Sequence, residues 1–193
     1  MPAIKDIGRS MMEITIREID ASTLRYVNRS DNAYVVNSRL VINAENGKIS
    51  YSVVAEPPHT KRFQPDEIDY STYISNPEKT VFFAFVQGNL AGQVRVLKWW
   101  NGYAYIGSIV VDDKYRRQGV GRVLMDRVVD WSKANGLPGI MLETQSNNVA
   151  ACRLYERCGF VLGGFDEYLY KGLNPATDEI ALYWYLVFNS RSG

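Results

Sequence analysis

The sequence has few of the residues that build metal sites and disulfide frameworks. It contains two cysteines, Cys152 and Cys158, and one histidine, His59. The cysteines stand six residues apart on one predicted helix, where they fall on different faces, which argues against a disulfide and against a metal site. We therefore predict no bound metal and a reducing, cytoplasmic location. His59 follows two prolines and is interpreted as a surface residue.

The sequence also lacks a long apolar run and a strong charge of either sign. No run approaches the roughly 18 apolar residues that a membrane-spanning helix needs. Residues 1–12 lack the apolar core of a signal peptide, and we interpret them as a flexible tail. A formal net charge of +1 gives no field that would recruit nucleic acid. We expect no membrane or nucleic-acid partner, and one domain over residues 13–193.

The first half of the chain is dominated by strand patterns. Residues 13–19 alternate apolar and polar side chains and predict a strand. Residues 34–42 and 49–54 flank an Asn-Gly pair, which is typical of a hairpin, and Pro57-Pro58 is expected to end its second strand. The last three strands of this half, predicted over residues 81–86, 90–98 and 103–111, form a meander.

The second half opens with the clearest helix, predicted over residues 118–135, whose apolar residues fall on one stripe. A buried strand over 139–143 follows, so strand, helix and strand form a crossover that pairs the two strands in parallel. A second helix is predicted over 149–158. A short strand at 160–162 is expected to break at Gly163-Gly164, with residues 165–170 extended after the break. A final strand is predicted over 179–188.

The stretch from Val110 to Val123 has the pattern of a phosphate-binding loop. An apolar strand passes through a charged turn and two glycines, Gly119 and Gly121, into the long helix. Free N–H groups and the positive end of the dipole at a helix start attract phosphate, and arginines can add charge-assisted contacts. The loop lacks the Gly-Lys-Ser/Thr ending of a Walker motif and the third glycine of a Rossmann motif. A pyrophosphate bound without metal, as in coenzyme A, fits this pattern.

Two motifs resemble the GNAT family of N-acetyltransferases. The run from Arg116 to Gly121 is similar to that family's pyrophosphate loop, and the run from Asn148 to Phe160 is similar to its second cofactor motif. The resemblance implies an α/β (α+β) fold with a mixed, mostly antiparallel central sheet, splayed at acetyl-CoA, and helices on both faces. The cofactor-binding residues that it implies are Ile109, Val110, Val111, Arg116, Arg117, Gln118, Gly119, Val120, Gly121, Arg122, Asn148, Ala151 and Tyr155.

Within that family the chain resembles the streptothricin acetyltransferases. The similar pieces are the run from Leu142 to Asn148, the Tyr103–Ile106 segment and the late Trp184-Tyr185 pair. This resemblance implies acetyl transfer to a primary amine of a small cationic molecule. Candidate residues for binding that cation are acidic or aromatic: Asp66, Glu67, Asp69, Tyr105 and Asp166. Asp166 is also explained by a turn, and the 63–77 stretch by a solvated loop or short helix.

The chemistry needs a group that accepts the proton of the amine and one that gives a proton to the departing thiolate. Tyr155 matches the family's acid, although its helical spacing also suits a core residue. The antibiotic acetyltransferases usually carry an acidic residue where this chain has Gly107. Glu143, at the end of a strand, is the substitute base, or a residue that holds a neighbouring loop. No covalent intermediate on the enzyme is required.

Three alternatives remain open from sequence. The enzyme acts on a small amine, or it acetylates protein N-termini or lysines, or it binds acyl-CoA without turnover as a sensor. The glycine at position 107 favours the sensor. Exposed tryptophans at positions 99 and 100 hint at a homodimer.

Overall fold

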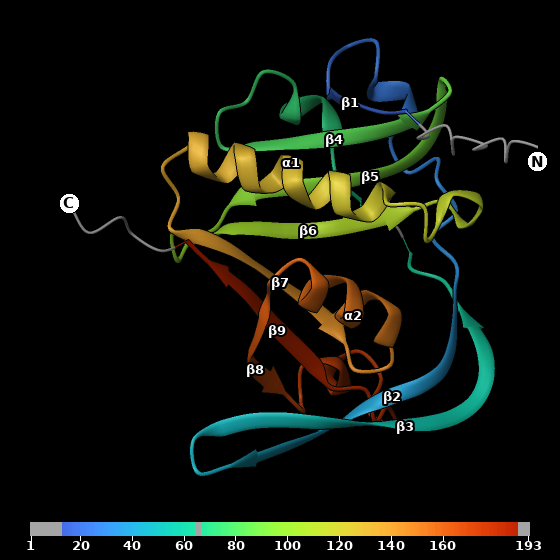
Figure 1. Cartoon of the computed structure of the whole chain (residues 1–193), viewed down its shortest axis with the longest axis vertical. Helices are drawn as coiled ribbons and strands as arrows, with labels where there is room; N and C mark the ends of the chain where they lie inside the picture. Colours follow the sequence, from blue (N-terminus) through green and yellow to red (C-terminus); the bar gives the residue numbers. More distant parts are fainter. Residues whose placement is uncertain (1–12, 65–66, 189–193) are drawn as a thin grey trace, which may run out of the picture.

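The structure is a computed structural model, and it describes residues 13–64 and 67–188. Seven of the strands in this part form one sheet in the order β1-β4-β5-β6-β7-β9-β8, and β2 and β3 form a separate ribbon (Figure 1). Along the sheet the strands are β1 (Ile14–Glu18), β4 (Lys79–Val86), β5 (Asn89–Lys98), β6 (Ala104–Val111), β7 (Gly139–Gln145), β9 (Ala181–Val187) and β8 (Val161–Asp166). The predicted flexible tail lies outside the described residues.

One strand pair sets the shape of the sheet. Strands β6 and β7 are parallel, as the predicted crossover requires, whereas the neighbouring pairs are antiparallel. The parallel pairing covers three residue pairs and ends at Ile106 opposite Leu142. Beyond that point β6 stays paired with β5, and the two halves of the sheet diverge (Figure 1). The predicted mixed, splayed sheet is confirmed.

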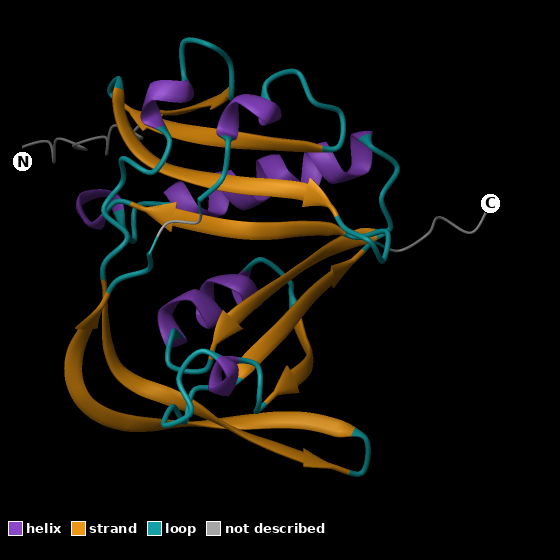
Figure 2. Cartoon of the chain, turned by 180° about the vertical axis from the view of Figure 1, so that it is seen from behind, coloured by secondary structure: helices purple, strands orange, loops and turns teal. Residues whose placement is uncertain are grey.

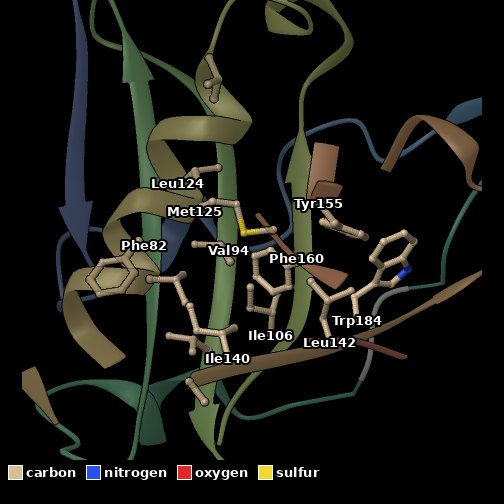
Figure 3. Packing of buried hydrophobic residues seen from close by; sticks show 14 of the residues in the cluster. Phe82, Val94, Ile106, Leu124, Met125, Ile140, Leu142, Tyr155, Phe160 and Trp184 are labelled. Atoms are coloured by element: carbon tan, nitrogen blue, oxygen red, sulfur yellow. The ribbon is translucent and has the colours of Figure 1, made fainter. Parts of the chain in front are cut away.

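Two α-helices pack on one face of the sheet. These are α1 (Val120–Ala134), which lies over β4, β5 and β6, and α2 (Val149–Arg157), which lies beside β7 and β9 (Figure 1). Their buried side chains join one cluster with every second residue of the strands, as Figure 3 shows for Leu124, Ile140 and Tyr155. The stripe predicted for α1 therefore does face the core.

The other face carries short helical turns in place of long helices. The turns η1 (Leu24–Tyr26) and η2 (Tyr70–Tyr73) lie on this face (Figure 2). Alternate residues of β4, including Phe83, pack in one cluster with residues of both turns. The predicted helices on both faces are thus present, but on this face they are 3-10 turns. The turns leave the sheet accessible near β6 and β7, where the cavity described below lies. No helix in the described part of the chain is long and apolar enough to cross a bilayer.

The hairpin ribbon consists of β2 (Tyr34–Glu45) and β3 (Lys48–Lys61), with the predicted Asn-Gly turn between them. The prediction that Pro57-Pro58 ends the second strand was wrong. The register jumps between Val36 and Ser38, from partner His59 to partner Ala55, so both prolines lie in an irregularity of the ladder. A ribbon edge tolerates proline there because no N–H is needed for pairing.

The predicted break at Gly163-Gly164 was also wrong. Strand β8 continues through both glycines to Asp166, with a shift of register between Leu162 and Gly164. An extra residue in one strand of an antiparallel pair bends the strand without ending it. The chain then turns through η4 (Tyr170–Gly172) before it enters β9.

Candidate active site

The divergence of β6 and β7 opens a cavity of about 240 Å³. One wall is the edge of β6 after its pairing with β7 has ended, and the other is the end of β7. Helix α2 contributes Tyr155 and Asn148, and the segment before the ribbon contributes polar side chains. The described residues that line it are Asn28, Ser30, Asn32, Phe63, Gln64, Tyr70, Gln93, Ile106, Gly107, Ser108, Ile109, Val110, Leu142, Glu143, Thr144, Gln145, Asn148 and Tyr155.

Tyr155 is a buried residue that reaches the cavity from α2. Its ring lies 6.2 Å from that of Trp184 and 6.1 Å from that of Phe160, so the surrounding core fixes its position (Figure 3). Burial raises the pKa of its hydroxyl well above the ordinary value, and the nearby Cys152 and Glu143 act in the same direction. The hydroxyl therefore keeps its proton at neutral pH and can donate it. The structure confirms that Tyr155 is a core residue, and its role as proton donor stays a prediction.

Glu143 is the one acidic side chain among the described residues that line the cavity. It lies on β7 opposite Tyr183 of β9, and the Tyr170 hydroxyl donates a hydrogen bond to its Oε1. Burial raises the pKa of Glu143, and the Tyr170 hydrogen bond opposes that rise. A partly desolvated carboxylate with a raised pKa is a stronger base than an exposed one.

Gly107 is a glycine because an arginine occupies the space above it. A Cβ atom built on Gly107 would lie 2.6 Å from Cζ of Arg95, whose side chain comes from the neighbouring strand β5. Arg95 is buried, and its Nη1 donates to the Tyr73 hydroxyl at 3.4 Å. The position that the resemblance associates with an acid therefore lies against a cation here. Position 107 therefore offers no carboxylate to the cavity.

The predicted phosphate loop runs from the end of β6 through η3 (Asp113–Tyr115) to α1. Asp112 caps η3 by accepting a hydrogen bond from the Lys114 N–H at 3.2 Å. Arg117 and Gly119 both have positive φ angles, 59° and 91°, and turn the chain into the helix. The first intrahelical bond joins the Val123 N–H to the Gly119 carbonyl, so the preceding N–H groups are oriented outward.

The three arginines of this region lie in different surroundings. Arg116 donates to the carbonyls of Val111 and Ala33 and pairs with Asp113. Arg122 pairs with Asp126 and donates to the Arg157 carbonyl at the end of α2. The Arg117 side chain is exposed and makes no hydrogen bond or ion pair with other residues of the described ranges. Two of the arginines thus stabilise the loop and helices, and Arg117 is available to a ligand.

The remaining predicted cofactor residues are divided between the cavity wall, the loop and the core. Ile109 and Val110 line the cavity, and Val111 follows them at the end of β6. Asn148 lines the cavity and also caps α2, accepting from the Ala151 N–H at 3.3 Å. Gln118 donates to the Lys114 carbonyl at 2.6 Å, which closes the loop. Val120 is buried in the core, and Gly121 faces Leu154 of α2.

The described residues that were predicted to bind the amine do not line the cavity. Asp66 lies outside the described residues. Glu67 is exposed, and Asp69 caps η2 by accepting from the Ser71 N–H; neither lines the cavity. Asp166 caps the turn before η4, accepting from the N–H groups of Tyr168 and Leu169 at 2.7 and 3.1 Å. Tyr105 stacks on Trp99, with 4.6 Å between the ring centroids, and does not line the cavity.

Several residues of the site belong to no sequence motif and were not predicted. Gln93 is buried and exchanges hydrogen bonds with Asn28, at 2.8 and 3.0 Å, in the cavity wall. Gln93 and Arg95 interrupt an otherwise apolar strand, and this polar interruption of a buried strand is the signal that sequence offers. Tyr170 is brought to Glu143 by a turn 27 residues later in the chain.

Comparison with known proteins agrees with this geometry. Residues 49–160 match the model of the acetyltransferase (GNAT) family, which is more than half of the chain. The chain belongs to the GNAT family. Its members transfer an acetyl group from acetyl-CoA, and the chain is an acetyl-CoA-dependent N-acetyltransferase with the fold of that family.

Similar GNAT proteins cover most of the chain. Streptothricin acetyltransferase A of Bacillus subtilis is 35% identical over 83% of this chain and 92% of its own length. The streptothricin acetyltransferase of Escherichia coli is 33% identical over 81% and 86%. A crystal structure described as a streptothricin acetyltransferase of Bacillus anthracis, in complex with acetyl coenzyme A, has a TM-score of 0.85. That structure is 43% identical and covers 93% of this chain and 99% of its own.

The comparisons do not favour the alternative activities. A ribosomal-protein alanine N-acetyltransferase of Escherichia coli matches 90 residues, or 46% of this chain. Its solved counterpart, at 19% identity, supports the fold alone. A protein acetyltransferase and a non-catalytic sensor are therefore the weaker interpretations of this GNAT chain.

Proposed function

We propose that the acceptor of this N-acetyltransferase is a primary amine of a small, cationic antibiotic of the streptothricin type. The proposal is supported by the names of the relatives that span most of the chain. It is carried by one observation on this chain: Glu143 is the one acidic side chain among the described residues of the cavity wall. A partly buried carboxylate there attracts an ammonium group and can take its proton. Tyr105, next to the cavity, adds an aromatic surface suited to a cation.

In this proposal, different residues bind the pantetheine arm and the pyrophosphate of acetyl-CoA. At Ile109–Val111 the edge of β6 that faces β7 is unpaired, while the other edge stays paired with β5, so the backbone groups on the open edge can pair with the amides of the pantetheine arm. The N–H groups at the start of α1 and the Arg117 guanidinium suit the pyrophosphate. Asn148 and Ala151 face the arm from α2. When bound, acetyl-CoA supplies the acetyl group as a thioester.

Glu143 is the base in this proposal. A free amine has a reference pKa of about 10, so at neutral pH it must give up a proton before it can attack. The raised pKa of Glu143 brings its carboxylate closer to the amine in basicity. Gly107 on the opposite wall cannot help, because the Arg95 guanidinium lies over it.

Tyr155 is the acid. Tyr155 lines the cavity, and the raised pKa of its hydroxyl keeps it protonated until a thiolate forms beside it. Direct attack of the amine in a ternary complex needs these two groups and no nucleophile on the enzyme. This assignment places the acid on α2 and the base on β7, on two of the walls of one cavity.

The test is acetyl-CoA consumption with a panel of amines. The panel holds streptothricin, a lysine-bearing peptide and a peptide with a free N-terminal alanine. We expect turnover on the antibiotic and a loss of about 10²-fold or more in kcat for Tyr155→Phe, the usual size of a general acid's contribution. Coenzyme A affinity should stay the same.

Tyr103→Phe is the matched control, because the Tyr103 ring packs edge-on against Tyr185 outside the cavity lining. It should keep parental kcat. Turnover on the peptides alone would show that the acceptor is a protein amine and would refute the proposed antibiotic acceptor. Coenzyme A binding without turnover on any amine would favour a sensor.

A further inference from the structure

We propose that Tyr170 is the positioning residue that orients the Glu143 carboxylate for proton transfer, and that the turn capped by Asp166 puts Tyr170 in place. This inference rests on the proposed role of Glu143 as base. It gives Asp166 a role through Tyr170, in place of the direct contact with the substrate cation expected from sequence.

The contact itself is the first observation. The Tyr170 hydroxyl donates to Oε1 of Glu143, and among the described hydrogen bonds this is the one that holds that carboxylate. With Oε1 engaged, Oε2 is left to accept a proton from a ligand in the cavity. A side chain that has one fixed hydrogen bond occupies a single rotamer, which a base needs for efficient transfer.

The turn is the second observation. Asp166 ends β8 and accepts from the N–H groups of Tyr168 and Leu169, at 2.7 and 3.1 Å. The Lys171 N–H then donates to the Tyr168 carbonyl, and the Leu173 N–H donates to the Tyr170 carbonyl, each at 3.0 Å, so that η4 follows directly. The side-chain cap thus sets the direction in which the chain enters η4.

Burial within the turn shows what it places. Tyr168, Leu169 and Leu173 are exposed, at 74%, 44% and 87%. Tyr170 is half-buried and reaches Glu143. The turn contributes little apolar packing through its other large side chains, so its ordered geometry serves mainly to deliver the Tyr170 hydroxyl to the cavity wall.

The surroundings of Glu143 make this hydrogen bond matter. The titratable groups that face it are hydroxyls: Tyr155 from α2, Tyr170 from η4 and Tyr183 from β9. Tyr105 and Glu179 lie near Tyr170, and the Arg95 guanidinium lies over Gly107. Burial raises the pKa of Glu143, and donation from Tyr170 lowers it, so the tyrosine favours the charged form that acts as base.

The test is Tyr170→Phe, which keeps the ring and removes the donor. We expect the acid limb of the kcat/KM profile to move to higher pH by about one to two units, the range for a lost hydrogen bond to a charged group. At neutral pH we expect kcat to fall about tenfold or more, with KM for acetyl-CoA unchanged. Asp166→Ala, which loosens the turn, should shift the limb in the same direction by less.

The matched control is Tyr183→Phe, which removes a hydroxyl from the residue opposite Glu143 that makes no described hydrogen bond to it. Its profile should match the parent's. A second readout is independent of turnover: the carboxyl carbon of Glu143, assigned with Glu143→Gln, is titrated by NMR in the parent and in Tyr170→Phe. An upward shift supports the proposal, and an unchanged titration overturns it. A parent that acetylates no amine refutes the proposed function and leaves the NMR result standing.

Discussion

At the scale of residues, the contact between Gly107 and Arg95 distinguishes this site from the pattern that the resemblance implies. The guanidinium of one fills the space that a side chain of the other would need, with 2.6 Å between Cζ and a Cβ on Gly107. The family's usual acidic position is thereby converted into a position next to a buried cation. The proton acceptor that we propose, Glu143, lies instead on β7, where it is paired with Tyr183 of β9. Sequence showed the missing acid, but a neighbour 12 positions away explains it.

Gly107→Ala tests this contact. The added methyl must displace a buried guanidinium, so the free energy of unfolding should fall by about 1–3 kcal/mol, the usual cost of overpacking. Gly164→Ala is the control, because a Cβ there would lie 3.8 Å from the Tyr183 ring, an ordinary contact. Urea denaturation measures both. Equal losses in the two variants would show that Arg95 yields freely.

At the scale of elements, the arginines of the loop and of the start of α1 have different roles: two of them hold the structure together, and one is available to a ligand. Arg116 holds the loop against Val111 and Ala33, and Arg122 joins α1 to the C-terminal end of α2. Arg117, in a left-handed conformation and exposed, has neither task. The sequence motif does not distinguish the three arginines, whereas their hydrogen-bond and ion-pair partners in the structure do.

The comparison of Arg117→Gln with Arg122→Gln tests this division. For Arg117→Gln we expect the Kd for coenzyme A to rise about three- to tenfold, since one charge-assisted contact to phosphate is lost at an exposed site, and stability to stay the same. For Arg122→Gln we expect a loss of stability of up to about 1 kcal/mol, because its ion pair is half exposed and screened. Calorimetric titration and urea denaturation give the two quantities. The reverse pattern would assign the phosphate to Arg122.

At the scale of the whole molecule, the ribbon of β2 and β3 closes the lower half of the fold around α2 (Figure 1). Leu40 of β2 is 2% exposed and belongs to the main core, and its N–H donates to the Ser146 carbonyl at 2.8 Å. Ser146 follows directly after the end of β7, which forms a wall of the cavity. The ribbon therefore supports the strand end that carries Glu143 and Thr144.

Leu40→Ala tests how far the ribbon is part of the core. We expect the free energy of unfolding to fall by about 2–5 kcal/mol, the range for a buried leucine. Val41→Ala, one position along and 41% exposed, should cost less than about 1 kcal/mol. Thermal and urea unfolding measure both. A small loss for Leu40→Ala would mean that the ribbon is only loosely attached to the sheet.

The sequence alone was sufficient for the family, the cofactor and the order of the elements. Those features depend on local patterns: the glycine loop before α1, the Asn148 cap with Tyr155 behind it, and the Asn-Gly turn of the ribbon. Backbone geometry and helix starts are set by residues a few positions apart, so a short stretch of sequence carries the information. Two local rules failed, at Pro57-Pro58 and at Gly163-Gly164, because irregular pairing with a distant strand absorbed residues that would otherwise end a strand.

Only the tertiary structure decided which residues meet in the cavity. It placed Arg95 over Gly107, Tyr170 on Glu143 and Asn28 on Gln93, and left Glu67 and Asp69 outside the cavity wall. Each of these contacts joins residues of different elements, through strand order and the divergence of β6 from β7. Such neighbours are set by how the whole sheet packs, and no spacing along the chain encodes them.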